Sequence, residues 1–156
     1  MTDINTEPGT DRTPIPTVAF TLRPIGVVHA TPRNKARTSK YFVPKGRAIL
    51  ELFQPYLSGL QGLYGGIELW VITYHAPSRA SSADSHPGGG DIPGVFSTTS
   101  VGRPNPIEFL RARITEFDSE RGLLHVEGLD SEDGAPILDI RPATAPHHRL
   151  TKPGEG

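Results

Sequence analysis

Glycine and proline divide this chain into short segments. The 156 residues include 17 glycines and 16 prolines, and both residue types interrupt helices and strands. No stretch carries the pattern of a long amphipathic helix, and the sequence has no internal repeat. Between the turns lie short runs rich in β-branched and aromatic residues. This spacing predicts an all-β fold: a small, single-domain β-barrel with short helical turns and flexible termini.

The strongest predicted strand is Ile67–His75, which carries the only tryptophan of the chain and should lie in the centre of a sheet. Pro55–Leu60 fits a single helical turn. The other expected strands are an edge strand that begins at Phe20–Leu22 and resumes after Pro24, followed by residues 48–53, 107–117, 123–129 and 137–141. Residues 107–117 and 123–129 should form a hairpin.

Three regions follow from this pattern. Residues 1–17 are polar, and we expect them to form a flexible N-terminal tail. Residues 18–142 should form the barrel domain, and residues 143–156 a flexible C-terminal tail. His29 is expected to end the first strand as a polar surface residue. In the last strand, strict alternation would put Leu138 and Ile140 on one face, and Ile137, Asp139 and Arg141 on the other.

Composition excludes several classes of protein. The chain has no cysteine, which rules out a disulfide framework, a thiolate zinc site and a cysteine nucleophile. No apolar run is long enough to span a membrane, and the N-terminus has no hydrophobic signal core. We therefore expect a cytoplasmic protein without a membrane partner.

Charge is unevenly distributed, although the net charge is only −1. The segment Arg33–Arg47 contains six basic residues and no acidic one. It can be a solvated loop, or a rim that faces the phosphates of a nucleic acid with Tyr41 and Phe42 among the basic residues.

The segment Arg103-Pro104-Asn105-Pro106-Ile107 is unusually stiff. Its two prolines fix the backbone and remove two amide donors, and the residues before them are held extended. A stiff segment loses little entropy when it grips a ligand. The segment can therefore be the wall of a ligand site, or a proline-rich surface connection.

Common catalytic patterns are missing. The sequence has no nucleophile elbow, dinucleotide fingerprint or Walker loop. Asp84, His86 and Asp91 lack the spacing of a metal site, so no metal is predicted. Four carboxylates near the end of the chain suit hydroxyl or amino groups of a small molecule: Glu127, Asp130, Asp133 and Asp139. Structural alternatives remain for two of them, since Asp133-Gly134 can form a tight turn and Asp139 can pair with Arg141 or Arg103.

Several motifs occur together in a characteristic order. They are Gly94-Val95-Phe96-Ser97-Thr98, then Arg103-Pro104-Asn105-Pro106-Ile107, then Leu129-Asp130 with Asp133-Gly134-Ala135-Pro136 and Ile137-Leu138-Asp139-Ile140-Arg141-Pro142. In this order they resemble the TsaA-like (YaeB/TrmO) family. Pro24-Ile25-Gly26-Val27-Val28 resembles the family's opening strand, and Leu69-Trp70 with His75 its central strand.

The resemblance implies a β-barrel that binds S-adenosylmethionine, often as a homodimer with the cofactor near the subunit interface. It implies methyl transfer to N6-threonylcarbamoyladenosine at position 37 of tRNA, with the segment Arg33–Arg47 as a candidate tRNA contact. By position, the cofactor contacts would be His75, Thr99, Phe109, Glu127, Gly128, Leu129 and Asp130, with Tyr41 and Phe42 as further candidates. Arg103, Asn105, Asp133 and Asp139 would support the site, and no catalytic residue is assigned.

The chain departs from the family pattern at several positions. Thr99 replaces an arginine that would supply a charged fork, Glu108 replaces a glycine, Glu68 a histidine and His29 an arginine. These changes reduce positive charge near the expected site. They favour an alternative function, a divergent S-adenosylmethionine-binding paralogue that is non-catalytic or methylates a small molecule.

Overall fold

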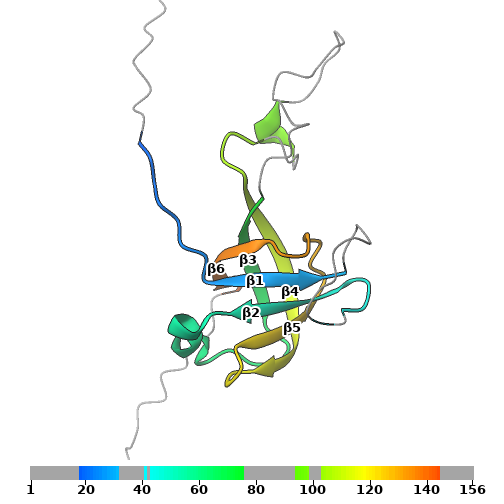
Figure 1. Cartoon of the computed structure of the whole chain (residues 1–156). Coiled ribbons are helices and arrows are strands. Elements are labelled where there is room, and N and C mark those ends of the chain that lie inside the picture. Colours follow the sequence, from blue (N-terminus) through cyan, green and yellow to red (C-terminus); the bar gives the residue numbers. More distant parts are fainter. Residues whose placement is uncertain (1–17, 32–40, 42, 76–93, 99–102, 145–156) are drawn as a thin grey trace, which may run out of the picture.

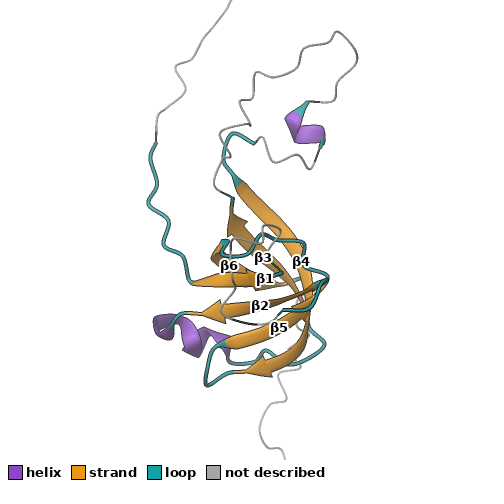
Figure 2. Cartoon of the chain, turned by 45° about the vertical axis from the view of Figure 1, so that its right-hand side comes forward, coloured by secondary structure: helices purple, strands orange, loops and turns teal. Residues whose placement is uncertain are grey.

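The computed structural model describes residues 18–31, 41, 43–75, 94–98 and 103–144. Within these residues, the regular structure consists of six strands and two short 3₁₀ helices. In chain order they are β1 (Gly26–Ala30), β2 (Arg47–Leu52), η1 (Gln54–Leu60), β3 (Glu68–Tyr74), η2 (Val95–Ser97), β4 (Ile107–Asp118), β5 (Leu123–Glu127) and β6 (Pro136–Pro142). Figure 2 shows the strands forming the body of the molecule, with η1 beside it.

The six strands close into one antiparallel barrel in the order β1-β2-β5-β4-β3-β6 (Figure 1). β1 closes the barrel by pairing with both β2 and β6. β4 is the longest strand, with 12 residues. Its first half pairs with β3 and its second half with β5. The predicted all-β barrel is therefore confirmed.

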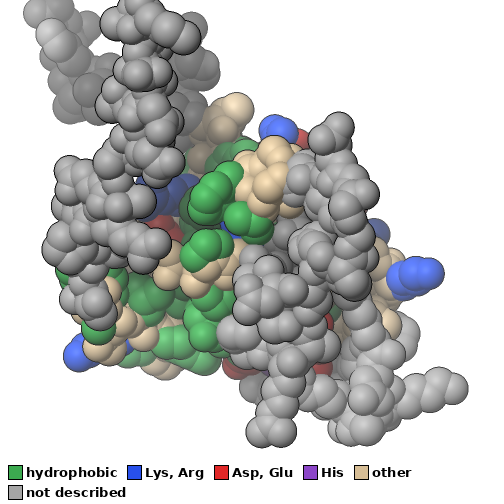
Figure 3. Space-filling model, turned by 90° about the horizontal axis from the view of Figure 1, so that it is seen from above, with side chains coloured by type: hydrophobic (Ala, Val, Ile, Leu, Met, Phe, Trp, Pro, Cys, Tyr) green, Lys and Arg blue, Asp and Glu red, His purple; other side chains and the backbone are tan. Residues whose placement is uncertain are grey.

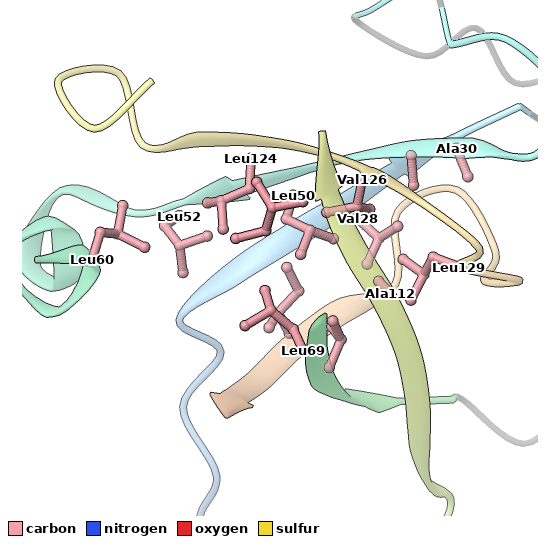
Figure 4. Packing of buried hydrophobic residues seen from close by; sticks show 14 residues of the cluster. Val28, Ala30, Leu50, Leu52, Leu60, Leu69, Ala112, Leu124, Val126 and Leu129 are labelled. Carbon is pink, nitrogen blue, oxygen red and sulfur yellow. The ribbon is translucent and has the colours of Figure 1, made fainter. Parts of the chain in front are cut away.

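Apolar side chains from every strand fill the barrel. Alternate residues point inward because strand side chains alternate between two faces, and five of the largest are essentially inaccessible: Leu50, Leu69, Ile114, Leu124 and Ile137. Figure 4 shows Leu52 and Leu60 toward one end of this core and Ala30 and Leu129 toward the other. Each fully buried side chain of this size contributes about 1.5–3 kcal/mol, so the core is the main source of stability.

The two ends of the barrel differ in what lies over them. β1, β3 and β5 finish at one end, which we call the site end, and β2, β4 and β6 begin there. At the opposite end the 3₁₀ helix η1 and the following loop border a groove of about 920 Å³. Among the described residues, no helix is long and apolar enough to cross a membrane.

Most predicted strands and the helical turn occur where the sequence indicated them. β2, β3, the β4–β5 hairpin, β6 and η1 are confirmed. The strand expected at Phe20–Leu22 is wrong: these residues are exposed and unpaired in any sheet, and β1 begins only at Gly26. Leu22 instead borders a hollow on the outer surface of the barrel, beside residues of β3, β4 and β6.

His29 is also not the surface residue that was predicted. Its exposed fraction is 8%, and its Nε2 lies 2.7 Å from Glu51 Oε2. The Tyr41 ring packs edge-on against the imidazole at 4.7 Å. His29 faces outward from the barrel, but residues of the β1–β2 connection cover it, which the local sequence pattern does not reveal.

The predicted alternation in β6 fails because of a β-bulge. Ile72 lies opposite Asp139, whereas the next residue, Thr73, lies opposite Ile137. Leu138 is thus the extra residue, and the face that points inward changes after it. Ile137 and Ile140 consequently both pack on the core, although they were expected on opposite faces.

Candidate functional site

The loops at the site end form a cleft of about 540 Å³. Its walls come from two connections, the one between β1 and β2 and the one that leads from β5 to β6. The lining residues are Ala30, Thr31, Lys45, Gly46, Arg47, Gly128, Leu129, Asp130 and Ser131. Two cations and one carboxylate therefore meet an apolar floor, which is a donor and acceptor set suited to a polar small molecule.

Two glycines shape the cleft. Gly46 and Gly128 both have positive φ, 80° in each case, a conformation that side-chain-bearing residues rarely adopt. The Gly128 N–H donates to the Gly46 carbonyl at 3.4 Å. A Cβ at either position would meet nothing within 4 Å. The backbone of both loops is therefore open to an approaching ligand.

The segment from Gly128 to Ala135 links β5 to β6 across the site end, and Asp133 fixes it to β1. Asp133 Oδ1 accepts a hydrogen bond from the Ala30 N–H at 3.1 Å. The Gly134 N–H donates to the Val28 carbonyl at 2.8 Å, and Gly134 has a positive φ of 84°. The tight turn considered as an alternative for Asp133-Gly134 is present, and Asp133 holds the backbone that carries Asp130.

His75 follows β3 at the same end of the barrel. Its backbone N–H donates to the Pro106 carbonyl at 2.8 Å. Its Nδ1 lies 3.9 Å from Glu132 Oε2, and the side chain is 19% exposed. Two residues earlier, the Thr73 hydroxyl is fully buried and, among the described residues, has no hydrogen-bond partner. The register places Glu108 opposite Thr73, so both side chains are on the inward face of their strands.

Glu127 ends β5 and is exposed. In the sheet it lies opposite Arg47 on β2 and Arg113 on β4. Leu129 is 5% exposed and packs in the core, so only its backbone can take part in binding. Tyr41 lies against His29 rather than in the cleft. The predicted contacts Phe42 and Thr99 lie outside the described residues.

Phe109 lies in a different place. It is on the outward face of β4, opposite Ile72, and is 67% exposed. It borders a second hollow of about 630 Å³ on the outer surface of the barrel, together with Leu22, Phe96, Arg103, Asn105 and Asp139. Figure 3, which views the molecule from above, shows hydrophobic side chains gathered on one face with basic and acidic groups beside them.

The stiff segment before β4 forms part of this second hollow. Arg103 Nη1 donates to the carbonyls of Val95 and Thr98, at 3.1 and 3.0 Å, and the guanidinium lies 5.9 Å from the Phe96 ring. The Asn105 carbonyl accepts from the Ile107 N–H at 2.7 Å. Arg103 therefore holds η2 in place.

Asp139 forms a structural ion pair. Its Oδ2 accepts from Arg141 Nε at 2.8 Å, and its Oδ1 accepts from the Ile140 N–H at 2.9 Å. The pairing with Arg141, one of the alternatives raised by the sequence, is thus confirmed. Asp139 stabilises β6 next to the second hollow and lies away from the cleft.

Sequence reasoning missed part of the cleft. Lys45 and Gly46 were seen only as members of a basic segment, and Glu132 was not singled out. Gly46 could have been recognised, because a glycine after Pro44-Lys45 and before the apolar run Ala48-Ile49-Leu50 marks a turn into a strand. Its approach to Gly128 depends on the pairing of β2 with β5, which no local pattern contains.

The fold and the cleft together define a small β-barrel protein with a cleft at one end that suits a small molecule. Comparison with known proteins is more specific. Residues 27–146 match the family model of the tRNA-methyltransferase O N-terminal domain, and the chain belongs to this family. The resemblance to the TsaA-like (YaeB/TrmO) family is confirmed.

Curated relatives cover most of this chain. A probable S-adenosyl-L-methionine-binding protein of Methanothermobacter thermautotrophicus is 31% identical over 127 residues, which are 78% of this chain and 88% of the relative. The tRNA (adenine(37)-N6)-methyltransferase of Escherichia coli is 28% identical over 135 residues, which are 80% of this chain but 57% of that enzyme. This chain thus spans little more than half of the bacterial enzyme.

Solved structures agree with the fold. A crystal structure of TrmO from Pseudomonas aeruginosa aligns with a TM-score of 0.58 at 26% identity, over 88% of this chain and 62% of that one. The barrel described above is therefore the architecture of an experimentally known family.

Proposed function

We propose that this protein binds S-adenosylmethionine at the site end of the barrel and transfers its methyl group to N6-threonylcarbamoyladenosine at position 37 of tRNA. The observation that carries the proposal is the cleft formed by Lys45–Arg47 and Gly128–Ser131. It contains Gly128, Leu129 and Asp130, which the family resemblance had assigned to cofactor contact. The named activities of the relatives support the same reading.

The residues of the cleft fit the chemical groups of this cofactor. Lys45 and Arg47 offer cationic donors for a carboxylate, and Asp130 offers an acceptor for ribose hydroxyls. The open backbone at Gly46 and Gly128 allows close approach. When bound, S-adenosylmethionine supplies an electrophilic methyl group, and the protein supplies alignment and exclusion of water.

Methylation of a nitrogen also requires a proton acceptor. The N6 nitrogen gains the methyl group and loses a proton, while the sulfur keeps the electron pair of its broken bond. At the site end, His75 and Glu132 are adjacent, with 3.9 Å between His75 Nδ1 and Glu132 Oε2. We propose this pair as the proton acceptor.

A homodimer would reconcile the positions of the proposed contacts. Phe109 lies on the outer face of β4, whereas Gly128–Asp130 line the cleft beside β1, β2 and β5. One cofactor would contact both sets most simply if Phe109 came from a second copy. Exposed apolar residues support such an interface, since Leu22, Phe96 and Phe109 are 54%, 79% and 67% exposed.

A second candidate function is a divergent paralogue that binds the cofactor without acting on tRNA. Glu108 favours it, because this carboxylate lies on the inward face opposite Thr73, where the family pattern has glycine. A negative charge there would disfavour a nucleic acid substrate. This paralogue would be non-catalytic or would methylate a small molecule.

Two measurements test the proposal. Calorimetric titration of the full chain with S-adenosylmethionine should show saturable binding, and no heat of binding would refute the cofactor site. Labelled cofactor with bulk tRNA that contains the modified adenosine should give ribonuclease-sensitive label. Binding without transfer would favour the paralogue, and transfer to a small-metabolite extract that survives ribonuclease would favour a small acceptor.

A further inference from the structure

A row of three side chains crosses the outer face of the barrel on β6, β3 and β4. In the sheet register, Trp70 lies opposite Arg141 on one side and Arg111 on the other. We call these three residues the Trp70 row. Directly paired residues on one face of a sheet have Cβ atoms about 5 Å apart, so the Trp70 side chain is flanked by those of two arginines.

The row is accessible to a partner. Trp70 is 38% exposed, and the Arg111 and Arg141 side chains are 57% and 73% exposed. The Arg111 guanidinium carbon lies 5.8 Å from the centre of the Trp70 ring, which is a cation–π distance. A large aromatic ring on the outside of a central strand is not needed to fill the core.

Two carboxylates orient the arginines without fixing them. Arg111 pairs with Glu68, and Arg141 with Asp139. Exposed pairs of this kind contribute at most about 1 kcal/mol, so a phosphate can compete for the guanidinium groups. In the adjacent row on the side away from Phe109, Arg113 lies between Glu68 and Glu127, and Glu127 also lies opposite Arg47. Four arginines therefore face three carboxylates on this surface, Glu68, Glu127 and Asp139, which leaves an excess of one positive charge.

These features match a surface that binds single-stranded nucleic acid. Such surfaces combine exposed aromatic rings, on which bases stack, with basic groups that contact the backbone. Sheets that recognise RNA use the same arrangement on an exposed face. A protein partner fits less well, because the core of a protein interface is depleted of charged residues such as Glu68 and Asp139.

We propose that the Trp70 row binds an unpaired RNA base by stacking on Trp70, with Arg111 and Arg141 contacting the neighbouring phosphates. The inference rests on the proposed function, because it identifies where the loop of a tRNA substrate would dock. The next row contains Phe109, the proposed cofactor contact. RNA bound to the Trp70 row of one copy would thus lie next to Phe109 of the same copy, which contacts the cofactor bound to the other copy.

The single tryptophan makes a direct test possible. Since Trp70 is the only one in the chain, all tryptophan emission reports on this row. An RNA stem-loop with an unpaired loop should quench the emission saturably and should protect it from acrylamide. A fully paired RNA duplex of the same length should quench it much less. Equal quenching by both RNAs would overturn stacking as the mode of binding.

Variants separate this proposal from the cofactor site. Trp70→Thr should weaken binding of a labelled stem-loop by about 10-fold or more, whereas Trp70→Tyr should retain most of the affinity. Tyr64→Thr is the matched control, because Tyr64 is a 65% exposed aromatic residue at the opposite end of the barrel. Arg111→Gln should lower the slope of log affinity against log salt by about 0.7–0.9.

The outcomes distinguish the two proposals. Unchanged heat of S-adenosylmethionine binding in Trp70→Thr, together with lost RNA binding, supports the Trp70 row. If cofactor binding and tRNA methylation persist while Trp70→Thr leaves RNA affinity intact, the row is refuted and the proposed function stands. If high protein concentration alone, without RNA, protects the tryptophan emission from acrylamide, a second copy covers the row and the proposal is refuted.

Discussion

Nε2 of His29 and Oε2 of Glu51 lie 2.7 Å apart on the outer side of the β1–β2 pair. Side-chain exposures of 10% and 24% show that both groups are largely shielded from solvent. Tyr41 packs edge-on against the imidazole, and Val43, Ile49 and Leu123 form a small apolar cluster with Tyr41. The polar contact therefore joins β1 to β2, and the packing of Tyr41 on His29 holds the β1–β2 connection against the barrel wall.

Replacement of His29 should loosen that connection. His29→Ala removes a hydrogen bond from a shielded carboxylate and leaves a gap beneath Tyr41, so we expect the free energy of unfolding to fall by about 1–3 kcal/mol. Urea denaturation followed by circular dichroism measures the change. Arg23→Ala, an exposed residue before β1, is the control. Equal stability of the two variants would show that the contact contributes little.

Gly26 is required by the close pairing of β1 with β2. A Cβ at this position would lie 2.3 Å from the Glu51 carbonyl oxygen, so the backbone would have to move. Gly26→Ala should destabilise the barrel by about 1–3 kcal/mol or prevent folding. Gly59→Ala is the matched control, because a Cβ there meets nothing within 4 Å. A thermal midpoint for Gly26→Ala at or above that of the control would contradict this explanation.

Asp133 should act through the hydrogen bond that its carboxylate accepts from the Ala30 N–H. Asp133→Ala leaves this amide without that acceptor, and the expected loss of stability is about 1–2 kcal/mol. Faster hydrogen exchange at the Ala30 amide is the specific measurement. Asp133→Asn keeps an oxygen at the δ position of the side chain, so the Ala30 amide should keep most of its protection in this variant. If the Ala30 amide exchanges equally fast in Asp133→Asn and Asp133→Ala, this hydrogen bond does not fix the loop.

Asp130 is the residue on which the cofactor proposal depends most directly. Its side chain is exposed at the cleft, so Asp130→Ala should leave the stability nearly unchanged. A hydrogen bond to a charged group contributes about 1.5–3 kcal/mol, and affinity for S-adenosylmethionine should therefore fall at least 10-fold. Calorimetry measures the affinity, with Glu120→Ala at the opposite end of the barrel as control. Equal affinity of both variants for S-adenosylmethionine would show that the cofactor does not bind in this cleft.

Strand positions were largely predictable, because residue type and turn chemistry act locally. The run around Trp70 indicated β3, and the turn before Leu123 indicated the β4–β5 hairpin. Failures occurred where a distant segment decides the environment. His29 is covered by Tyr41, and the face of Ile137 depends on a bulge against Ile72 and Thr73.

The site was predictable only in its parts. The resemblance named His75, Asp130 and Phe109 as if they shared one pocket. In the structure, Asp130 lines the cleft, Phe109 borders the outer hollow, and His75 lies beside Glu132. The order of the motifs indicates which residues contribute to the site. The distances between these residues depend on the strand order and on the number of copies that assemble.

The sequence by itself determined the all-β character, the strand positions and the family, because periodicity, turn residues and ordered motifs are local properties of the chain. Only the tertiary structure decided that Lys45–Arg47 meet Gly128–Ser131 in one cleft and that Trp70 lies between Arg111 and Arg141. Both arrangements result from pairing between strands that are distant in the sequence. Such pairing is selected by burial of the whole core, which no single segment encodes.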